Sequence, residues 1–226
     1  MRKVLAIIAA ALLGSVCASA QFSLKAGFQK SQIISTNVAA DGFRSYLYAW
    51  FDGFYAGATS SYSLIIPGLS FDYSILYSYA TGTETDVLSI FADPHYEAAK
   101  AGQCITDEHS IRVPGTVNYG YAFTKSFKAS IFAGAEVDYC LSSKSYSSWP
   151  GLDGINHWNV DHFGADTNYN GYRRFDLGVL GGLGFEFMNM IRLETGVRYG
   201  LLDRSAKTDD SLHAFGIYAG LAWLFK

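Results

Sequence analysis

Four consecutive residues, Asp107, Glu108, His109 and Ser110, bring two carboxyl groups, an imidazole and a hydroxyl together in the sequence. Groups of this kind can serve as general acid, general base and nucleophile. If the segment is a β-strand, however, adjacent side chains point to opposite faces, so His109 and Ser110 do not readily converge. The sequence contains no separate catalytic signature, and we therefore expect a protein that is not an enzyme.

Histidine and cysteine suggest two further kinds of site. His157, Asp161 and His162 could bind a transition metal, although histidines in loops are usually only solvated. Cys104 and Cys140 could form a disulfide in an oxidising compartment, and two free thiols are the alternative. Both features fall in the long connections described below or at their edges.

A third pattern matches the first half of a calcium-binding loop. Asp166, Asn168, Asn170 and Gly171 have the required spacing, but the twelfth position should be Glu and is Leu177. Because Leu177 falls inside an expected strand, a polar turn is the simpler interpretation. We expect neither a metal nor any other cofactor.

The composition excludes several classes of protein. Half of the 226 residues are hydrophobic and 16% are charged, and 16 Tyr and 16 Phe are too many for a disordered chain. A helical membrane protein would show several apolar runs of about 20 residues, whereas only the first 20 residues offer one. The acidic residues outnumber the basic ones, 20 to 17, which disfavours nucleic acid as a partner.

The first 20 residues have the layout of a secretory signal peptide. A positive head, Met1 to Lys3, precedes the apolar stretch 4–16, and Ala18, Ser19 and Ala20 form a small-residue cleavage site. Residues 1–20 are therefore expected to be removed, and residues 21–226 to form one domain. Loss of two basic residues makes the mature chain more acidic.

Apolar and polar residues alternate along most of the mature chain. Phe71 and Tyr73, for example, are interleaved with Asp72 and Ser74. A period of two is typical of β-strands. The clear segments are 69–79, 111–123, 127–139, 175–187, 191–201 and 213–225. Weaker patterns at 22–29 and 51–62 bring the total to eight strands, and in 51–62 the two faces cannot be assigned.

The lengths and connections of these segments predict an all-β, eight-stranded antiparallel up-and-down transmembrane barrel. Globular strands usually have 5–6 residues, whereas a tilted strand needs about 9–11 to cross a membrane. Short connections at 63–68, 124–126 and 188–190 alternate with long ones at about 30–50, 80–108, 141–174 and 202–212. This layout is typical of bacterial outer-membrane barrels, with both termini periplasmic and the long loops outside. A soluble, lipocalin-like barrel with its apolar faces inside is the alternative.

The polar faces of such strands would line a narrow interior that side chains fill. Five cationic and six anionic residues fall on these faces, so nearly all of them could pair, as buried charges must. We expect a polar plug that stiffens the barrel, and a selective ion path is the alternative. The expected charge network consists of Lys25, Asp72, Arg112, Lys128, Glu136, Asp138, Asp176, Glu186, Arg192, Glu194 and Arg198.

Aromatic residues cluster near the short turns on the apolar faces. An interfacial girdle of aromatic side chains belongs at this level of a membrane barrel. Its expected members are Tyr121, Phe123, Phe185, Phe187, Trp223 and Phe225.

Several barrel-building segments carry a family resemblance: Phe22–Phe28, Gly53–Gly57, Phe175–Phe187, Arg192–Gly200 and Gly220–Phe225. Through them the mature chain resembles the small outer-membrane β-barrel proteins of the Bacteroidota, which include PorT-like proteins, and more distantly the OmpX-like barrels. The resemblance implies that the barrel-insertion machinery reads the terminal aromatic residue during assembly. Here one residue, Lys226, follows Phe225.

The expected role is structural or interactive. The long segment 141–174 mixes aromatic with Ser, Asn, Asp and Gly residues, as binding loops do. Expected partners are outer-membrane lipid, lipopolysaccharide, and a protein or glycan at the extracellular loops. A narrow, porin-like channel for ions or small solutes is one alternative. The PorT-like resemblance implies another, an accessory of an outer-membrane secretion machine.

Overall fold

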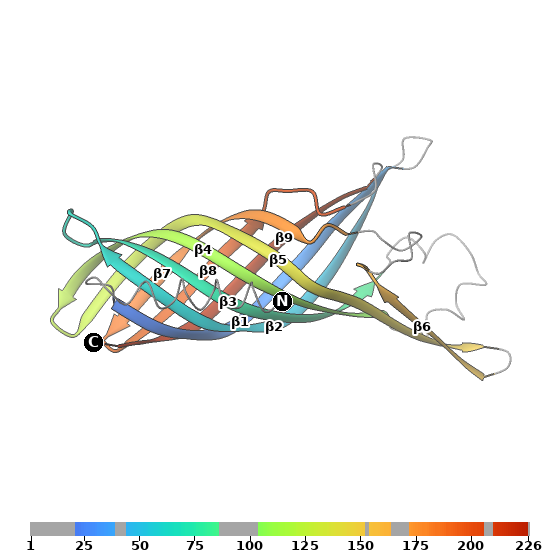
Figure 1. Ribbon diagram of the computed structural model, residues 1–226, viewed down its shortest axis with the longest axis horizontal. Coiled ribbons are helices and arrows are strands. Elements are labelled where there is room, and N and C mark those ends of the chain that lie inside the picture. Colours follow the sequence, from blue (N-terminus) through green and yellow to red (C-terminus); the bar gives the residue numbers. More distant parts are fainter. Residues whose placement is uncertain are drawn as a thin grey trace, which may run out of the picture.

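The computed structural model describes residues 21–38, 44–85, 104–151, 154–163, 172–205 and 210–225, so the predicted signal peptide lies outside the described residues. Nine strands form within these ranges (Figure 1). They are β1 (Gln21–Val38), β2 (Arg44–Ser63), β3 (Leu69–Thr85), β4 (Cys104–Thr124), β5 (Phe127–Gly151), β6 (Gly154–Asp161), β7 (Phe175–Phe187), β8 (Ile191–Gly200) and β9 (Asp210–Leu224). No helix in these ranges is long and apolar enough to cross a membrane.

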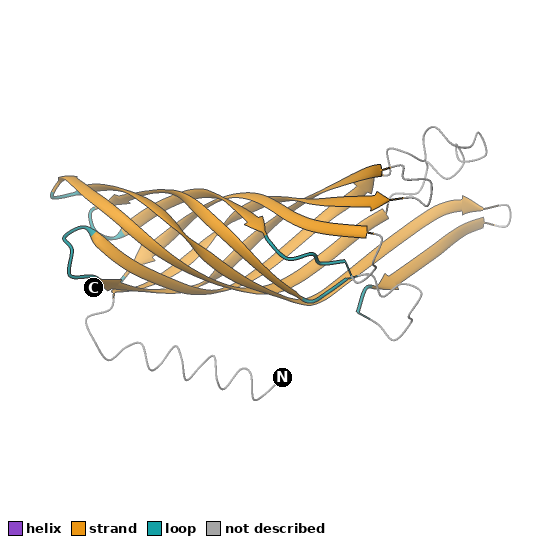
Figure 2. Cartoon of the chain, turned by 90° about the horizontal axis from the view of Figure 1, so that it is seen from above, coloured by secondary structure: helices purple, strands orange, loops and turns teal. Residues whose placement is uncertain are grey.

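Eight of the strands close into an antiparallel barrel, as the alternation predicted (Figure 2). Neighbours in sequence pair around the ring, β5 pairs with β7, and β9 returns to β1. Following paired residues once around the ring from Ala129 leads back to β5 at Tyr139, which is ten residues farther along the strand. The path is Ala129, Phe185, Leu193, Leu221, Ala26, Ala56, Tyr77, Ile111 and Tyr139. A stagger of this size requires steeply tilted strands around a narrow interior.

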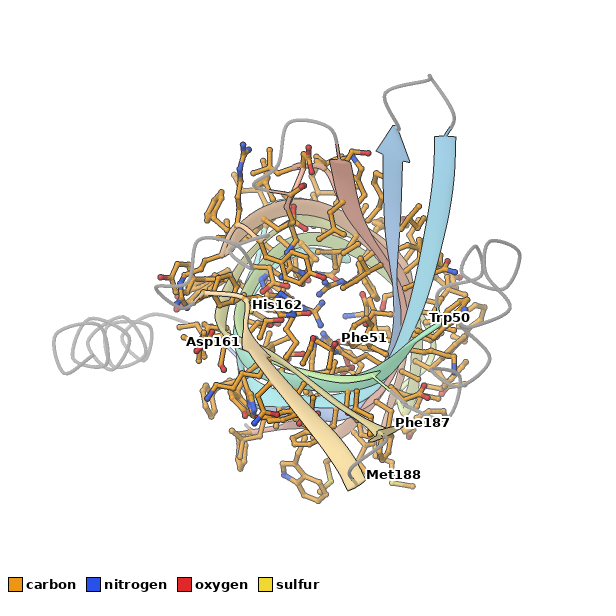
Figure 3. All side chains as sticks on the ribbon, turned by 90° about the vertical axis from the view of Figure 1, so that its right-hand side faces the viewer. Trp50, Phe51, Asp161, His162, Phe187 and Met188 are labelled. Atoms are coloured by element: carbon orange, nitrogen blue, oxygen red, sulfur yellow. The ribbon has the colours of Figure 1, made fainter. Side chains whose placement is uncertain are left out.

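The apolar side chains point outward. In β7, Phe175, Leu177 and Val179 are 47%, 36% and 45% exposed, whereas Asp176 between them is buried. Figure 3 shows the same division in β2, where Phe51 lies toward the interior and Trp50 toward the outside. An apolar outer wall around a polar interior is the arrangement of a membrane barrel, so the lipocalin-like alternative is wrong.

Aromatic rings gather at two levels of this outer wall. Near the short turns, the Phe127 and Phe185 rings stack with centroids 6.5 Å apart, and near the long-loop end Tyr79 and His109 lie 5.0 Å apart. In β7 ten residues separate Phe185 from Phe175. With a rise of about 3.3 Å per residue and a tilt of about 45°, they span about 23 Å. The apolar band of an outer-membrane barrel has this height.

The strands continue beyond this band, which corrects the expected loop boundaries. Residues 30–38, 44–50, 80–85, 104–108, 141–151 and 154–161 are strand, and residues 210–212 belong to β9. β6 forms a hairpin with the far end of β5 outside the ring, at the end opposite the C-terminus (Figure 1). In β6 the apolar residues Ile155 and Trp158 are three positions apart, so the sequence of this strand does not keep the alternation that marked the other strands.

The faces of β2, which the sequence left open, are now assigned. Phe51, Tyr55 and Thr59 point into the barrel, while Asp52 and Phe54 lie on the outer wall. The two large aromatic residues on the inner face and the carboxylate on the outer face explain why the pattern of this strand was ambiguous.

Candidate functional site

Arg192 of β8 braces the half of the lumen that is nearest the short turns. Its guanidinium lies 3.0 Å from Asp72, 3.3 Å from Glu186 and 3.6 Å from Glu194. Lys25 of β1 also contacts Glu194, at 2.5 Å. These five side chains come from β1, β3, β7 and β8, so they connect walls of the barrel that do not adjoin in the sheet.

A second network crosses the lumen closer to the long-loop end of the barrel. Arg112 lies 2.6 Å from Glu136, and Arg198 lies 3.1 Å from Glu136 and 3.3 Å from Asp138. Arg112 also donates a hydrogen bond of 2.7 Å to Gln29. Both guanidinium groups therefore have anionic partners on another strand, which buried arginines require.

Tyrosine and aliphatic side chains separate the two networks. The Tyr55 and Tyr218 rings meet edge to face with centroids 6.1 Å apart. Gly27 and Gly220 make room for them, because a Cβ at either position would overlap the Tyr55 hydroxyl. A cavity of about 30 Å³ borders this layer, with room for one or two water molecules. Buried Leu76, which breaks the alternation of β3, also lines it.

A third cluster lies at the long-loop mouth. Arg204, from the connection between β8 and β9, pairs with Glu108 of β4, and both side chains are largely buried. Burial opposes the charge on Arg204, but attraction by Glu108 outweighs it and raises the pKa of the guanidinium above its ordinary value. The backbone N–H of Arg204 donates to Leu212, so the pair also holds the connection against β9.

The eleven charged residues that the sequence assigned to the lumen all lie on inward-facing positions. Ten are buried or nearly so. Lys128 lies against Gly120 at the short-turn mouth, and no carboxylate in the described ranges is within ion-pair distance of it. Sequence reasoning missed Glu108 and Arg204. Glu108 is in phase with Arg112 along β4 and could have been found, whereas Arg204 follows a strand end and carries no such signal.

The sequence left a disulfide and two free thiols open for Cys104 and Cys140, and the structure does not join the two residues. Cys140 is a free thiol, 2% exposed and paired in register with Ser110. Cys104 pairs with Ser147. Six strand residues separate positions 104 and 110, or about 20 Å, whereas the Cα atoms of a disulfide lie within about 7 Å.

The candidate metal ligands do not converge among the described side chains. His162 points inward, where Nε2 lies 2.7 Å from the Ser145 hydroxyl. Asp161 is exposed and accepts a hydrogen bond from the backbone of Phe163. His157 lies in β6, and its side chain is outside the described part of the structure, as are the calcium-loop candidates Asp166, Asn168 and Asn170.

The polar quartet of β4 divides between the two faces of the wall. Glu108 and Ser110 face the lumen, whereas Asp107 accepts a hydrogen bond from Tyr79 on the outer wall. His109 also lies outside, with Nδ1 2.6 Å from the hydroxyl of an outer-wall tyrosine. Ser145, whose hydroxyl lies 2.7 Å from His162, is 1% exposed.

The expected aromatic girdle lies on the outer wall beside the short turns. Five of its six rings are between 43% and 62% exposed, and Phe185 is half-buried against Phe127. Phe22 extends the girdle through its ring contact with Phe225, 5.8 Å between centroids. The structure places the following residues there: Tyr121, Phe123, Phe185, Phe187, Trp223 and Phe225.

Several solved outer-membrane proteins are similar to the chain at low sequence identity, with TM-scores below 0.5. OprG from Pseudomonas aeruginosa is 14% identical, with a TM-score of 0.48 over 91% of this chain and 95% of that one. Neisserial surface protein A is 16% identical, with a TM-score of 0.41 over 92% and 100% of the two chains. Ail, the attachment invasion locus protein of Yersinia pestis, is 12% identical, with a TM-score of 0.41 over 92% and 100%.

No curated protein sequence matches the chain significantly. A family profile described as the outer membrane protein beta-barrel domain, in contrast, matches residues 18–204. This match and the apolar outer wall agree on an outer-membrane location. The chain belongs to the outer membrane protein beta-barrel domain family.

Proposed function

We propose that this protein is a closed outer-membrane scaffold that displays the β5–β6 hairpin at the cell surface, where the hairpin binds a saccharide of the surface layer. In this orientation the termini and short turns are periplasmic and the long connections are extracellular. The partner class includes the glycan part of lipopolysaccharide.

The observation that carries the proposal is the length of β5. It has 25 residues, about twice what a membrane crossing needs, and its last eight pair with β6 outside the ring. The base of the hairpin is fixed: Ser145 lies 2.6 Å from Thr106 of β4 and 2.7 Å from His162, whose ring stacks on Tyr172 at 4.3 Å. The barrel thus holds this hairpin outside the ring, at the end opposite the C-terminus (Figure 1).

The sequence of the hairpin supports a saccharide as partner. Between Ser145 and Val160 it contains Trp149 and Trp158, together with several Asn and Ser residues. Flat aromatic groups interleaved with adaptable amides and hydroxyls are what polar binding surfaces use. The filled lumen supports a surface role over transport, because ion pairs cross it at two levels within the membrane band.

Truncation of the hairpin tests this proposal. Ser145 and Val160 are paired, so replacing residues 146–159 by Asn-Gly would close the shortened hairpin with a two-residue turn. We expect the full-length protein to bind purified lipopolysaccharide or capsular polysaccharide of its own host in calorimetry, and the truncated barrel to lose that binding. Heat-modifiable migration on SDS gels controls for folding of both. Equal binding by both proteins, or none by the full-length protein, would contradict the proposal.

The resemblance to PorT-like Bacteroidota barrels supports a second proposal, an accessory role in an export machine. Its motifs, such as Gly53–Gly57 and Arg192–Gly200, build the barrel wall. This role predicts that the protein purifies from membranes in mild detergent with a stoichiometric second chain. Recovery of the single chain would count against it.

A further inference from the structure

The short-turn end carries an unusual concentration of exposed aliphatic side chains. In the turn between β2 and β3, Leu64, Ile65 and Ile66 are 42%, 103% and 59% exposed. In the turn between β7 and β8, Met188 and Met190 are 71% and 41% exposed. The third short turn, Thr124 to Ser126, is polar instead. Two of the three short turns therefore present large apolar groups where loop residues are normally polar.

The β2–β3 turn is fixed in this conformation by its backbone. The N–H of Leu64 donates to Leu69 at 2.9 Å, and the N–H of Leu69 donates to Ile66 at 3.0 Å. Gly68 has a φ of +82°, a conformation that favours glycine, and its carbonyl accepts from Gly120 of β4 at 2.8 Å. The exposure of Ile65 is thus a property of an ordered turn that is hydrogen-bonded to the barrel wall.

The apolar surface of this turn is continuous with the lipid-facing wall. The ring of Tyr119, half exposed on the outer face of β4, lies beside Gly68. On the adjoining strands, Tyr62 and Tyr73 stack at 6.1 Å between centroids. Aromatic side chains of this kind mark the membrane interface. The turn therefore follows directly after an interfacial layer instead of being separated from it by a polar segment.

We propose that the two apolar turns, Leu64–Ile66 and Met188–Met190, insert into the adjacent membrane leaflet and anchor the short-turn end of the barrel in phospholipid. Lipid is the occupant that the continuity with the aromatic girdle favours. Exposed apolar side chains are stabilised by leaving water, and the leaflet is the nearest apolar phase. The polar Thr124–Ser126 turn, by contrast, stays in water. The barrel thereby extends its apolar surface below the girdle on two opposite sides.

Site-directed spin labelling tests the proposal in phospholipid vesicles that contain only this protein. Ile65→Cys and Met188→Cys place a nitroxide on the apolar turns, and Lys125→Cys provides the matched control on the polar turn. Cys104→Ser is included in each variant. Cys140 is buried and free, so the Cys104→Ser protein without an introduced cysteine is treated with the label in the same way and reports any signal from Cys140. Molecular oxygen concentrates in lipid and a neutral nickel chelate concentrates in water, so their relaxation effects distinguish the two phases.

We expect the ratio of oxygen to nickel accessibility to be severalfold higher at positions 65 and 188 than at position 125. Heat-modifiable migration confirms that each labelled variant has folded. A ratio at position 65 equal to that at position 125 would overturn the proposal, because both turns would then lie in water. Shielding of position 65 from both reagents would also overturn it, because a second copy of the chain would then cover the turn.

Discussion

The membrane-crossing part of the lumen and the β5–β6 hairpin are held together in different ways. Within the lumen, Arg192 and Arg112 each contact groups from other strands, so one side chain connects several walls. In the hairpin, β6 pairs with β5 alone among the described strands, and the hairpin is fixed mainly at its base by Ser145 and His162. A defect in the lumen should therefore destabilise the whole barrel, whereas a defect in the hairpin should stay local.

This difference assigns the stability of the barrel to the lumen and the proposed binding to the hairpin. Charges in a closed lumen must be paired and cannot vary independently, while a projecting hairpin can change its sequence without disturbing the ring. The following changes test that separation, beginning with the largest expected effect.

Removing a shared carboxylate from the lumen should have the largest effect. Glu136→Leu leaves Arg112 buried without an anionic partner, and we expect a loss of about 3–5 kcal/mol in the free energy of unfolding. Urea-induced unfolding in detergent micelles measures this. Arg112→Met added to Glu136→Leu should recover most of the loss, because Arg198 keeps Asp138 as its partner. A single variant as stable as the wild type would show that the network does not brace the barrel.

Breaking the pair at the long-loop mouth should have a smaller effect. Arg204→Leu leaves Glu108 without its cation, but water can reach the mouth more easily than the mid-lumen, so we expect a loss of about 1–3 kcal/mol. The same change should loosen the packing near Cys140, which is 2% exposed in the intact protein. Maleimide labelling of Cys140 in a Cys104→Ser background should therefore become faster. Unchanged labelling and unchanged stability would show that the Arg204–Glu108 pair does not stabilise the long-loop mouth of the barrel.

Lowering the pH should loosen the hairpin while leaving the barrel intact. Burial lowers the pKa of His162 below its ordinary value of 6.5, partly opposed by Glu108 and Asp161, so the folded hairpin favours the neutral imidazole. Its contribution to stability is complete above pH 6.5 and is lost as the pH falls below that value. Amide exchange in β6, corrected for its intrinsic pH dependence, should accelerate there, while exchange in β7 and β8 stays slow. His162→Gln should remove the pH dependence, and its persistence would contradict the role of His162.

Truncating the hairpin should have the smallest effect on stability. Replacing residues 146–159 by Asn-Gly removes only the last two β4–β5 pairs of the ring, Cys104 with Ser147 and Ile105 with Tyr146, so the unfolding free energy should fall by about 1 kcal/mol or less. Thermal unfolding followed by circular dichroism measures this. A large loss would mean that the hairpin stabilises the barrel and is not an independent element.

The ring itself was predictable from the sequence because the membrane imposes one rule on every strand. Phe71 and Tyr73 must face lipid while Asp72 and Ser74 face the lumen, and this rule holds for about ten residues per strand. It fails where a side chain packs inside the barrel, as Leu76 and Tyr55 do. It also fails in β6, where the apolar residues Ile155 and Trp158 are three positions apart.

The partners within the lumen were not predictable, for a geometric reason. The pattern showed which charges point inward, but pairing depends on the ten-residue stagger, which brings Arg192 to Asp72 across the ring. The stagger depends on the register of all the strand pairs around the ring, and no short segment of the sequence specifies it. The pairing of Arg204 with Glu108 was hidden as well, because Arg204 lies in a connection that has no periodicity.

Conductance in planar lipid bilayers tests most directly whether the lumen is closed. Ion pairs at two levels and a cavity of only about 30 Å³ predict that the purified, folded protein gives no steady unit currents. Membranes containing it should conduct no more than protein-free membranes at the same voltage. Reproducible unit currents from protein whose folding is verified by heat-modifiable migration would contradict the closed lumen and would favour a narrow channel.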